Sequence, residues 1–168
     1  MDAMEAILSR RSVRRYTHQE ISDDLIQELL RAAMSAPSAG NAQPWHFVIV
    51  NDRVLLQEIP KFHPYSGMLN EAPVAIVVCV DLDAGPEGFL VQDGSAATEN
   101  ILIAAHAKGL GAVWLGVYPL RERIMGLRKL LAIPERILPL SLIAIGHPME
   151  RLPREDRYHS SRMHANRW

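Results

Sequence analysis

Anion binding is the chemistry that this sequence offers most clearly, in the segment SRRSVRRY at residues 9–16. Four arginines surround Ser12 there, although the formal net charge of the whole chain is only -1. Guanidinium groups bind phosphate through paired N–H donors, and a serine hydroxyl can add a further hydrogen bond. A solvated surface is the alternative interpretation of a short charged run. A second basic group in the tail favours one anion site shared by both ends of the chain, and it comprises Arg151, Arg154, Arg157, Arg162 and Arg167.

Two further segments carry polar groups on a restricted backbone. The loop at 37–45 offers hydroxyl and amide side chains between prolines, and Gly116 leaves the main chain accessible just before Tyr118. Such groups can bind a ligand, whereas an ordinary turn and an ordinary strand end are the alternative interpretations.

Residues that perform catalysis directly do not stand out. The seven histidines lack the spacings of metal ligands, and the GxSxG and GxxxxGK[ST] motifs are absent. The lone Cys79 lies in an apolar run, so we expect a buried hydrophobic side chain. Gly109 and Gly111 follow a predicted helix, which indicates helix-ending and turn glycines and not a dinucleotide fingerprint. The pattern favours an enzyme without a metal site, in which a cofactor carries the reaction and the protein orients it.

Composition limits the class of protein. With 168 residues, of which 48% are hydrophobic and 22% charged, the chain is expected to form a single domain over 1–168. One cysteine excludes an intrachain disulfide and favours a cytoplasmic setting. The N-terminus lacks the order of a signal peptide, and no apolar window is long enough to span a membrane. General nucleic-acid binding needs a broad basic face, and the net charge of this chain is only -1, so we expect no nucleic-acid partner. For lack of a spanning segment, we also expect no membrane partner.

Hydrophobic spacing predicts helices that alternate with strands. The predicted helices span 3–9, 23–34, 53–59, 91–108 and 120–131, and the predicted strands span 46–50, 74–80, 112–117 and 140–146. Ser22 is expected to cap the second helix, and Pro134 and Pro139 are expected to bracket a turn before the last strand. Residues 60–73 read as a long irregular connection. The order indicates an α+β or α/β domain with helices packed on a small sheet.

Three segments add to this picture. The run at 74–80 is apolar throughout, so we expect a central strand that is buried on both faces. The helix at 91–108 is apolar on nearly all sides, which is more than so small a chain can bury, and this favours a dimer interface. The tail at 147–168 has few core residues and is expected to fray or to wrap a partner subunit.

Taken together, these segments resemble the flavin-dependent nitroreductase family. The motifs that carry the resemblance cover most of the chain, namely SRRSVRRY at 9–16, APSAGNAQPWHFVIV at 36–50, DGSAATENILIAAHAKGLGAVWLGVYP at 93–119 and IAIGHPMERLPREDRYHSSRMHANRW at 143–168. The resemblance implies a three-layer α+β sandwich, with a small and mostly antiparallel central sheet flanked by helices. It also implies a homodimer that exchanges the C-terminal arms at 147–168 and holds two FMN sites at the subunit interface.

The resemblance further assigns residues to the FMN phosphate. Arg10 and Ser12 would hold the phosphate and the ribityl chain, with a contribution from Arg11. From the tail, Arg157 would close on the phosphate, and Arg154 is a second candidate for this role.

Around the flavin ring, the resemblance places Arg14 by the pyrimidine edge, where its charge would stabilise the reduced ring. The partner subunit would contribute Pro37, Ser38, Asn41 and Gln43. The ring would be lined by main-chain groups of Gly116, Val117 and Tyr118.

The implied activity is ping-pong oxidoreduction. NADH or NADPH would pass a hydride to the flavin, and a nitroaromatic, a quinone or a similar small electron acceptor would then be reduced. No side chain would act as the catalyst, because the flavin carries the chemistry. The alternatives are a flavin carrier or sensor without turnover, another reaction of the superfamily such as reductive dehalogenation, and a nucleic-acid-binding protein that uses its arginines.

Overall fold

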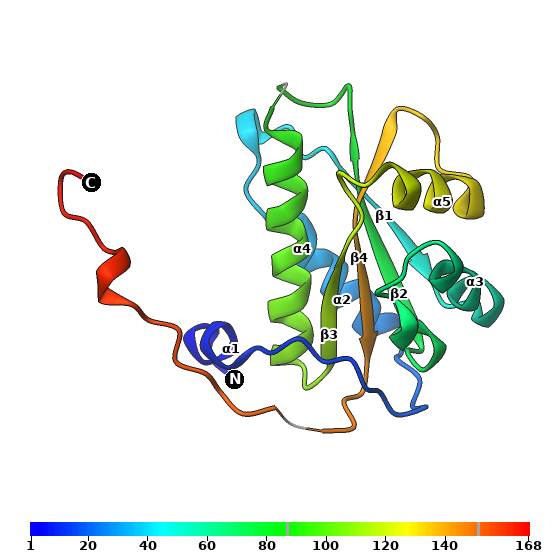
Figure 1. The fold of residues 1–168 in the computed structure, drawn as a ribbon, viewed down its shortest axis with the longest axis horizontal. Coiled ribbons are helices and arrows are strands. Elements are labelled where there is room, and N and C mark those ends of the chain that lie inside the picture. Colours follow the sequence, from blue (N-terminus) through cyan, green and yellow to red (C-terminus); the bar gives the residue numbers. More distant parts are fainter. Residues whose placement is uncertain (87, 151) are drawn as a thin grey trace.

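The structure, a computed structural model, describes residues 1–86, 88–150 and 152–168. Its helices and strands alternate as predicted, in an α+β arrangement (Figure 1). The α-helices in these ranges are α1 (Ala3–Ser9), α2 (Asp23–Met34), α3 (Arg53–Glu58), α4 (Leu90–Ala107) and α5 (Arg121–Leu131). The strands are β1 (Trp45–Val50), β2 (Val74–Asp81), β3 (Gly111–Gly116) and β4 (Ile137–Gly146).

Within the described residues, the strands form one four-stranded sheet in the order β1-β2-β4-β3, and every neighbouring pair is antiparallel. The prediction that 74–80 forms a central strand is confirmed, because all eight residues of β2 are buried. Alternate side chains of β2 belong to two different core clusters: Val77 faces one cluster and Ile76 faces the other. The sheet is therefore covered on both faces.

Figure 1 shows the three layers. Helices α2 and α4 cover one face of the sheet, where Leu29 and Ile101 are fully buried, and α3 and α5 cover the other face, where Leu56 and Leu127 are fully buried. Ser22 caps α2 as predicted, since its side chain accepts a hydrogen bond from the amide of Leu25. The predicted three-layer fold is confirmed.

The position of Pro139 in the structure differs from the predicted one. Strand β4 begins at Ile137, so Pro139 lies inside a strand and not at the end of a turn. It stands opposite Cys79, where the register between β2 and β4 shifts. Proline cannot donate to a regular ladder, and an irregularity of this kind accommodates it. The prediction that the turn extends to Pro139 is therefore wrong, because the strand has already begun at Ile137.

The segment after α1 runs beside the edge strand β3. Ser12 forms a parallel bridge with Ala112, and the amide of Val13 donates to the carbonyl of Ala112 at 3.0 Å. A Cβ at Gly111 would lie 2.7 Å from Val13, so glycine permits this close approach. The prediction of a turn glycine is thus wrong for Gly111, which begins β3, whereas Gly109 ends the preceding helix with a φ of +77°.

The C-terminal segment leaves the body of the protein. It departs after β4, where Tyr16 and Pro148 form an isolated bridge, and it projects away as an extended arm (Figure 1). From 153 onward its residues are exposed. Arg151, one of the arginines noted in the sequence, lies outside the described residues. Across the part of the chain that the structure describes, no helix is long and apolar enough to cross a membrane.

Candidate functional site

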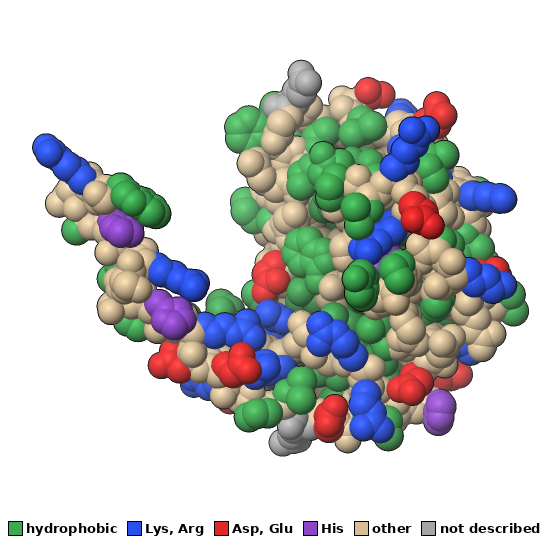
Figure 2. All heavy atoms as spheres, viewed as in Figure 1, with side chains coloured by type: hydrophobic (Ala, Val, Ile, Leu, Met, Phe, Trp, Pro, Cys, Tyr) green, Lys and Arg blue, Asp and Glu red, His purple; other side chains and the backbone are tan. Residues whose placement is uncertain are grey.

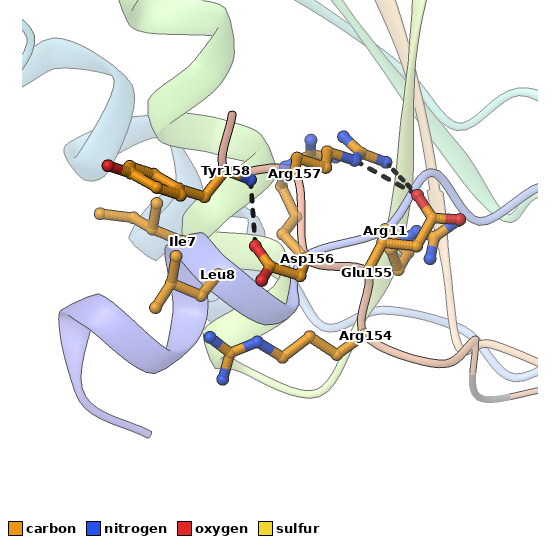
Figure 3. Close-up of a pocket in the computed structure, with 9 residues that line it drawn as sticks. Ile7, Leu8, Arg11, Arg154, Glu155, Asp156, Arg157 and Tyr158 are labelled. Atoms are coloured by element: carbon orange, nitrogen blue, oxygen red, sulfur yellow. Dashed lines mark hydrogen bonds and ion pairs between the residues drawn. The ribbon is translucent and has the colours of Figure 1, made fainter. Parts of the chain in front are cut away.

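Arginines from the two ends of the chain converge on one cavity. It has a volume of about 340 Å³ and lies between α1 and the start of the C-terminal arm (Figure 3). Four guanidinium-bearing residues line it, namely Arg10, Arg11, Arg154 and Arg157. The carboxylates in its lining are Glu155 and Asp156, so cations outnumber anions there. Figure 2 shows Lys and Arg side chains gathered where the arm joins the body. The surface run and the basic tail thus form one positively charged site.

Ion pairs orient these arginines. The Arg10 Nε lies 3.3 Å from a carboxylate oxygen of Glu99 on α4, and an Arg11 NH2 lies 2.9 Å from Glu155 on the arm. Glu155 also pairs with Arg157 at 3.1 Å. The hydrogen bond from Arg157, followed by the charge of Arg11, lowers the pKa of the Glu155 carboxyl. Glu155 thereby links the two ends of the chain.

Arg14 and Ser12 lie at the edge of the sheet. Ser12 is half-buried beside β3, and the Arg14 side chain is exposed, with NH1 at 3.5 Å from the carbonyl of Ser12. Arg14 is therefore not fixed by an ion pair among the described residues. Its guanidinium is available to a ligand that lies along the edge strand.

The loop that follows α2 is held in an unusual backbone conformation. Gly40, Asn41 and Gln43 all have a positive φ, of 59°, 57° and 49°. The Gln43 amide donates to Ser38 Oγ at 3.0 Å, and the Gln43 side-chain amide donates to Asn41 Oδ1 at 2.9 Å. Pro37, Asn41 and Gln43 are exposed, and Ser38 is half-buried. These contacts present polar side chains outward on a fixed turn.

Asp93, on the first turn of α4, anchors this loop. Its side chain is 5% exposed, and Oδ1 accepts a hydrogen bond from the amide of Ala39 at 3.0 Å. The arginines contact α4 further along, at Glu99, and Ser9 meets His106 at 2.8 Å. With a rise of about 1.5 Å per residue, Asp93 and Glu99 lie roughly 9 Å apart along the helix. None of the residues at 37–43 is among those that line the arginine cavity, so one chain does not bring the loop and the cavity together.

The end of β3 is open on one side. Gly116 is exposed, and a Cβ built there would have no heavy atom of the described residues within 4 Å. The amides of Val117 and Tyr118 donate to the carbonyl of Leu140, at 3.3 and 3.0 Å. These two N–H groups are thus engaged within the protein, and the open face of Gly116 is the part of this segment that a ligand can approach.

Two residues that sequence reasoning missed hold the carbonyl of Gly116. Arg123 NH1 donates to it at 2.6 Å, and His63 Nε2 lies 3.0 Å from it. Burial, followed by the charge of Arg123, lowers the pKa of His63, so the neutral imidazole donates through Nε2. His63 lies in the irregular connection at 60–73, and Arg123 is one of several charges on α5. Neither has a periodic signal that would single it out.

Cys79 is not part of the site. It is fully buried in β2, and burial raises the pKa of its thiol to about 12. The prediction of a buried hydrophobic side chain is confirmed.

Comparison with known proteins gives a consistent result. The family model described as "Nitroreductase family" matches residues 7–65 and 59–147. A protein of Methanothermobacter thermautotrophicus with the provisional name NADH dehydrogenase/NAD(P)H nitroreductase is 49% identical over 100% of this chain and 88% of its own length.

Two solved structures extend the comparison. A Parabacteroides distasonis protein with the same provisional name superposes with a TM-score of 0.96 at 41% identity, covering 99% of this chain and 98% of its own. A Desulfovibrio desulfuricans protein, provisionally named a nitroreductase and crystallised in complex with FMN, has a TM-score of 0.86 at 33% identity, covering 100% of this chain and 98% of its own. The family match over most of the chain and these relatives show that the protein belongs to the nitroreductase family.

Proposed function

We infer that the protein is an FMN-dependent NAD(P)H oxidoreductase that reduces a nitroaromatic, a quinone or a similar small electron acceptor. The observation that carries this proposal is the convergence of arginines from both ends of the chain on one cavity between α1 and the C-terminal arm. One relative is named for NAD(P)H and another was crystallised with FMN, and both support it.

The residues present fit the phosphate of FMN. Arg10, Arg11, Arg154 and Arg157 outnumber the carboxylates around a cavity that is large enough for a phosphate group. Arg10 and Arg11 are already held at 20% side-chain exposure, so a phosphate would meet preoriented guanidinium groups. Ser12 follows them in the sequence and is half-buried beside β3, outside the lining of the cavity.

The flavin ring fits along the edge strand. Arg14 is exposed just after the residues that contact β3 at Ala112, and Gly116 offers a face without a side chain at the end of β3. When bound, FMN supplies the redox chemistry, by accepting a hydride from NADH or NADPH and returning two electrons to the acceptor. The protein binds and orients the reactants, and the cation of Arg14 stabilises negative charge on the reduced ring.

We also propose a homodimer in which the loop of one subunit completes the site of the other. None of the loop residues lines the arginine cavity of its own chain, which supports this arrangement. On α4, Ala96 and Ile103 remain half-exposed in one chain, so the helix is only partly covered by its own subunit. The arm exposes Tyr158, and Trp168 is 102% exposed, which is the state of a side chain that another surface would bury.

Anaerobic reduction tests the activity. The purified protein is loaded with FMN and mixed with NADH or NADPH, and the visible flavin absorbance is followed. Loss of the absorbance, followed by its return on addition of a nitroaromatic or a quinone, is expected. A flavin that neither nucleotide reduces would instead identify a carrier or sensor without turnover.

Mixed dimers test the shared site. One subunit carries Arg10→Ala and Arg11→Ala, the other carries Ser38→Ala and Asn41→Ala, and two different tags select the mixed species. If each site takes its arginines and its loop from different subunits, the mixed dimer has one intact site and one site with both defects. We expect half of the wild-type FMN content and more than in either variant homodimer. Two equally weakened sites, or a flavin-loaded monomer in sedimentation, would contradict the shared site.

A further inference from the structure

Arg123 is a half-buried cation beside the open end of β3. Its NH1 donates to the carbonyl of Gly116 at 2.6 Å, and its guanidinium carbon lies 5.4 Å from the centre of the Tyr65 ring. The guanidinium is therefore fixed between a main-chain acceptor and an aromatic face.

Among the residues that the structure describes, the remaining donors of Arg123 have no partner. Across the described residues, no carboxylate pairs with it, and NH1 makes its only hydrogen bond. Arg53 donates through both terminal nitrogens to carbonyls that end a turn. Arg128 donates through NH2 to two carbonyls after α5, and its Nε is buried without a partner among the described residues. Arg123 also uses one nitrogen, but it lies beside the open end of β3, where Nε and NH2 are left for another acceptor.

The surroundings of Arg123 suit a flat, apolar molecule. Tyr65 is 70% exposed, Tyr118 is 43% exposed and Leu120 is 47% exposed, although all three are large hydrophobic side chains. Gly116, whose carbonyl Arg123 holds, adds no side chain there, and a Cβ built on it would meet nothing within 4 Å among the described residues. Aromatic surface next to an unpaired guanidinium is the combination that binds a planar ring with an anionic substituent.

We propose that Tyr65, Tyr118 and Arg123 form the acceptor subsite, and that this subsite selects aromatic acceptors that carry a carboxylate or a similar anionic group. The inference rests on the proposed function, since it places the acceptor beside the flavin site. Arg123 donates through Nε and NH2 to the carboxylate, and Tyr65 packs against the ring. For a nitro compound, the net two-electron step breaks one N–O bond. It consumes NADH and one proton and yields the nitroso compound, NAD⁺ and water.

The test compares 4-nitrobenzoate with the neutral and nearly isosteric 4-nitrobenzamide. In the wild type, kcat/KM is expected to favour the benzoate by about tenfold, the size of one charge-assisted contact. Arg123→Gln should abolish this preference, so that the ratio of the two kcat/KM values falls to about one, and Arg123→Lys should retain part of the preference. Arg121→Gln, which removes an exposed charge from the same helix, is the matched control and should keep the preference.

Binding without turnover gives the second readout. Benzoate and benzamide are titrated into the oxidised FMN-loaded protein, with calorimetry or the flavin difference spectrum as the signal. The wild type should bind benzoate more tightly, and Arg123→Gln should bind the two equally. Equal binding in the wild type, or the same loss in Arg121→Gln and Arg123→Gln, overturns the inference. Reduction of the flavin by NADH is measured separately, so a failure there contradicts the proposed function and not the subsite.

Discussion

Replacement of a single cavity arginine should weaken FMN binding more when the side chain of that arginine is less exposed to solvent. The side chains of Arg10 and Arg11 are 20% exposed, whereas that of Arg157 is 65% exposed. A charge-assisted hydrogen bond contributes about 1.5 to 3 kcal/mol where solvent screening is limited, which corresponds to roughly 10- to 150-fold in Kd. An exposed ion pair contributes at most about 1 kcal/mol, or roughly fivefold. Arg10→Ala and Arg11→Ala should therefore weaken FMN binding more than Arg157→Ala.

The assay is a fluorescence titration of the apoprotein with FMN and, in parallel, with riboflavin, which lacks the phosphate. The arginine variants should lose affinity for FMN and keep their affinity for riboflavin. Arg15→Ala is the matched control, because Arg15 is exposed and does not line the cavity. Equal losses for FMN and riboflavin, or a larger effect from Arg157 than from Arg10, would refute the assignment of the cavity to the phosphate.

Three further predictions concern the helix packing, the pH dependence and the flavin ring. A Cβ at Gly94 would lie 2.6 Å from Leu140, so Gly94→Ala should lower the free energy of unfolding by about 1 to 3 kcal/mol and Tm by roughly 2 to 10 °C in a thermal melt. Gly67→Ala is the control and should change Tm little, because a Cβ at Gly67 would meet no neighbour within 4 Å. The pKa of His63 is lowered by burial, so the unfolded state binds more protons as the pH falls below about 6.5. The stability that neutral His63 provides is therefore present above that pH and is lost below it. The free energy of unfolding, measured by denaturant titration at several pH values from about 7.5 to 5, should fall less steeply with decreasing pH in His63→Gln than in the wild type. Arg14→Ala should lower the FMN content and shift the flavin reduction potential to more negative values, and an unchanged potential would remove Arg14 from the ring.

The elements were predictable because their signals are local. The apolar run at 74–80 and the Ser22 cap need no knowledge of the rest of the chain, and both were confirmed. Pro139 was misjudged because a proline usually marks a turn, and only the pairing of β2 with β4 reveals the irregularity that accommodates it. Gly111 was misjudged for a similar reason, since its neighbour Val13 is distant in sequence.

The candidate site was predictable where charge was concentrated. Four arginines in seven residues stand out in a chain with a net charge of -1, and the structure brings Arg10 and Arg11 next to Arg157 as a shared anion site requires. Arg123 and His63 were missed because each is a single residue whose role depends on one carbonyl, that of Gly116. Such a contact is set by how α5 and the irregular connection pack on the sheet, and no spacing in the sequence encodes it.

Glu155 limits the binding free energy that a phosphate can gain from the arginines of the cavity. Arg11 and Arg157 already share this carboxylate, so a phosphate would replace existing contacts and not create all of its own. The hydrogen bond from Arg157, followed by the charge of Arg11, lowers the pKa of the Glu155 carboxyl, so both arginines favour its ionised form. Since Glu155 is exposed, with 53% of its side chain accessible, water can solvate it after displacement. The carboxylate therefore keeps the arginines oriented before the ligand arrives, at the expense of part of the affinity. The identity of the anion then depends on how well it outcompetes one exposed carboxylate, which favours a dianionic phosphate over a singly charged group.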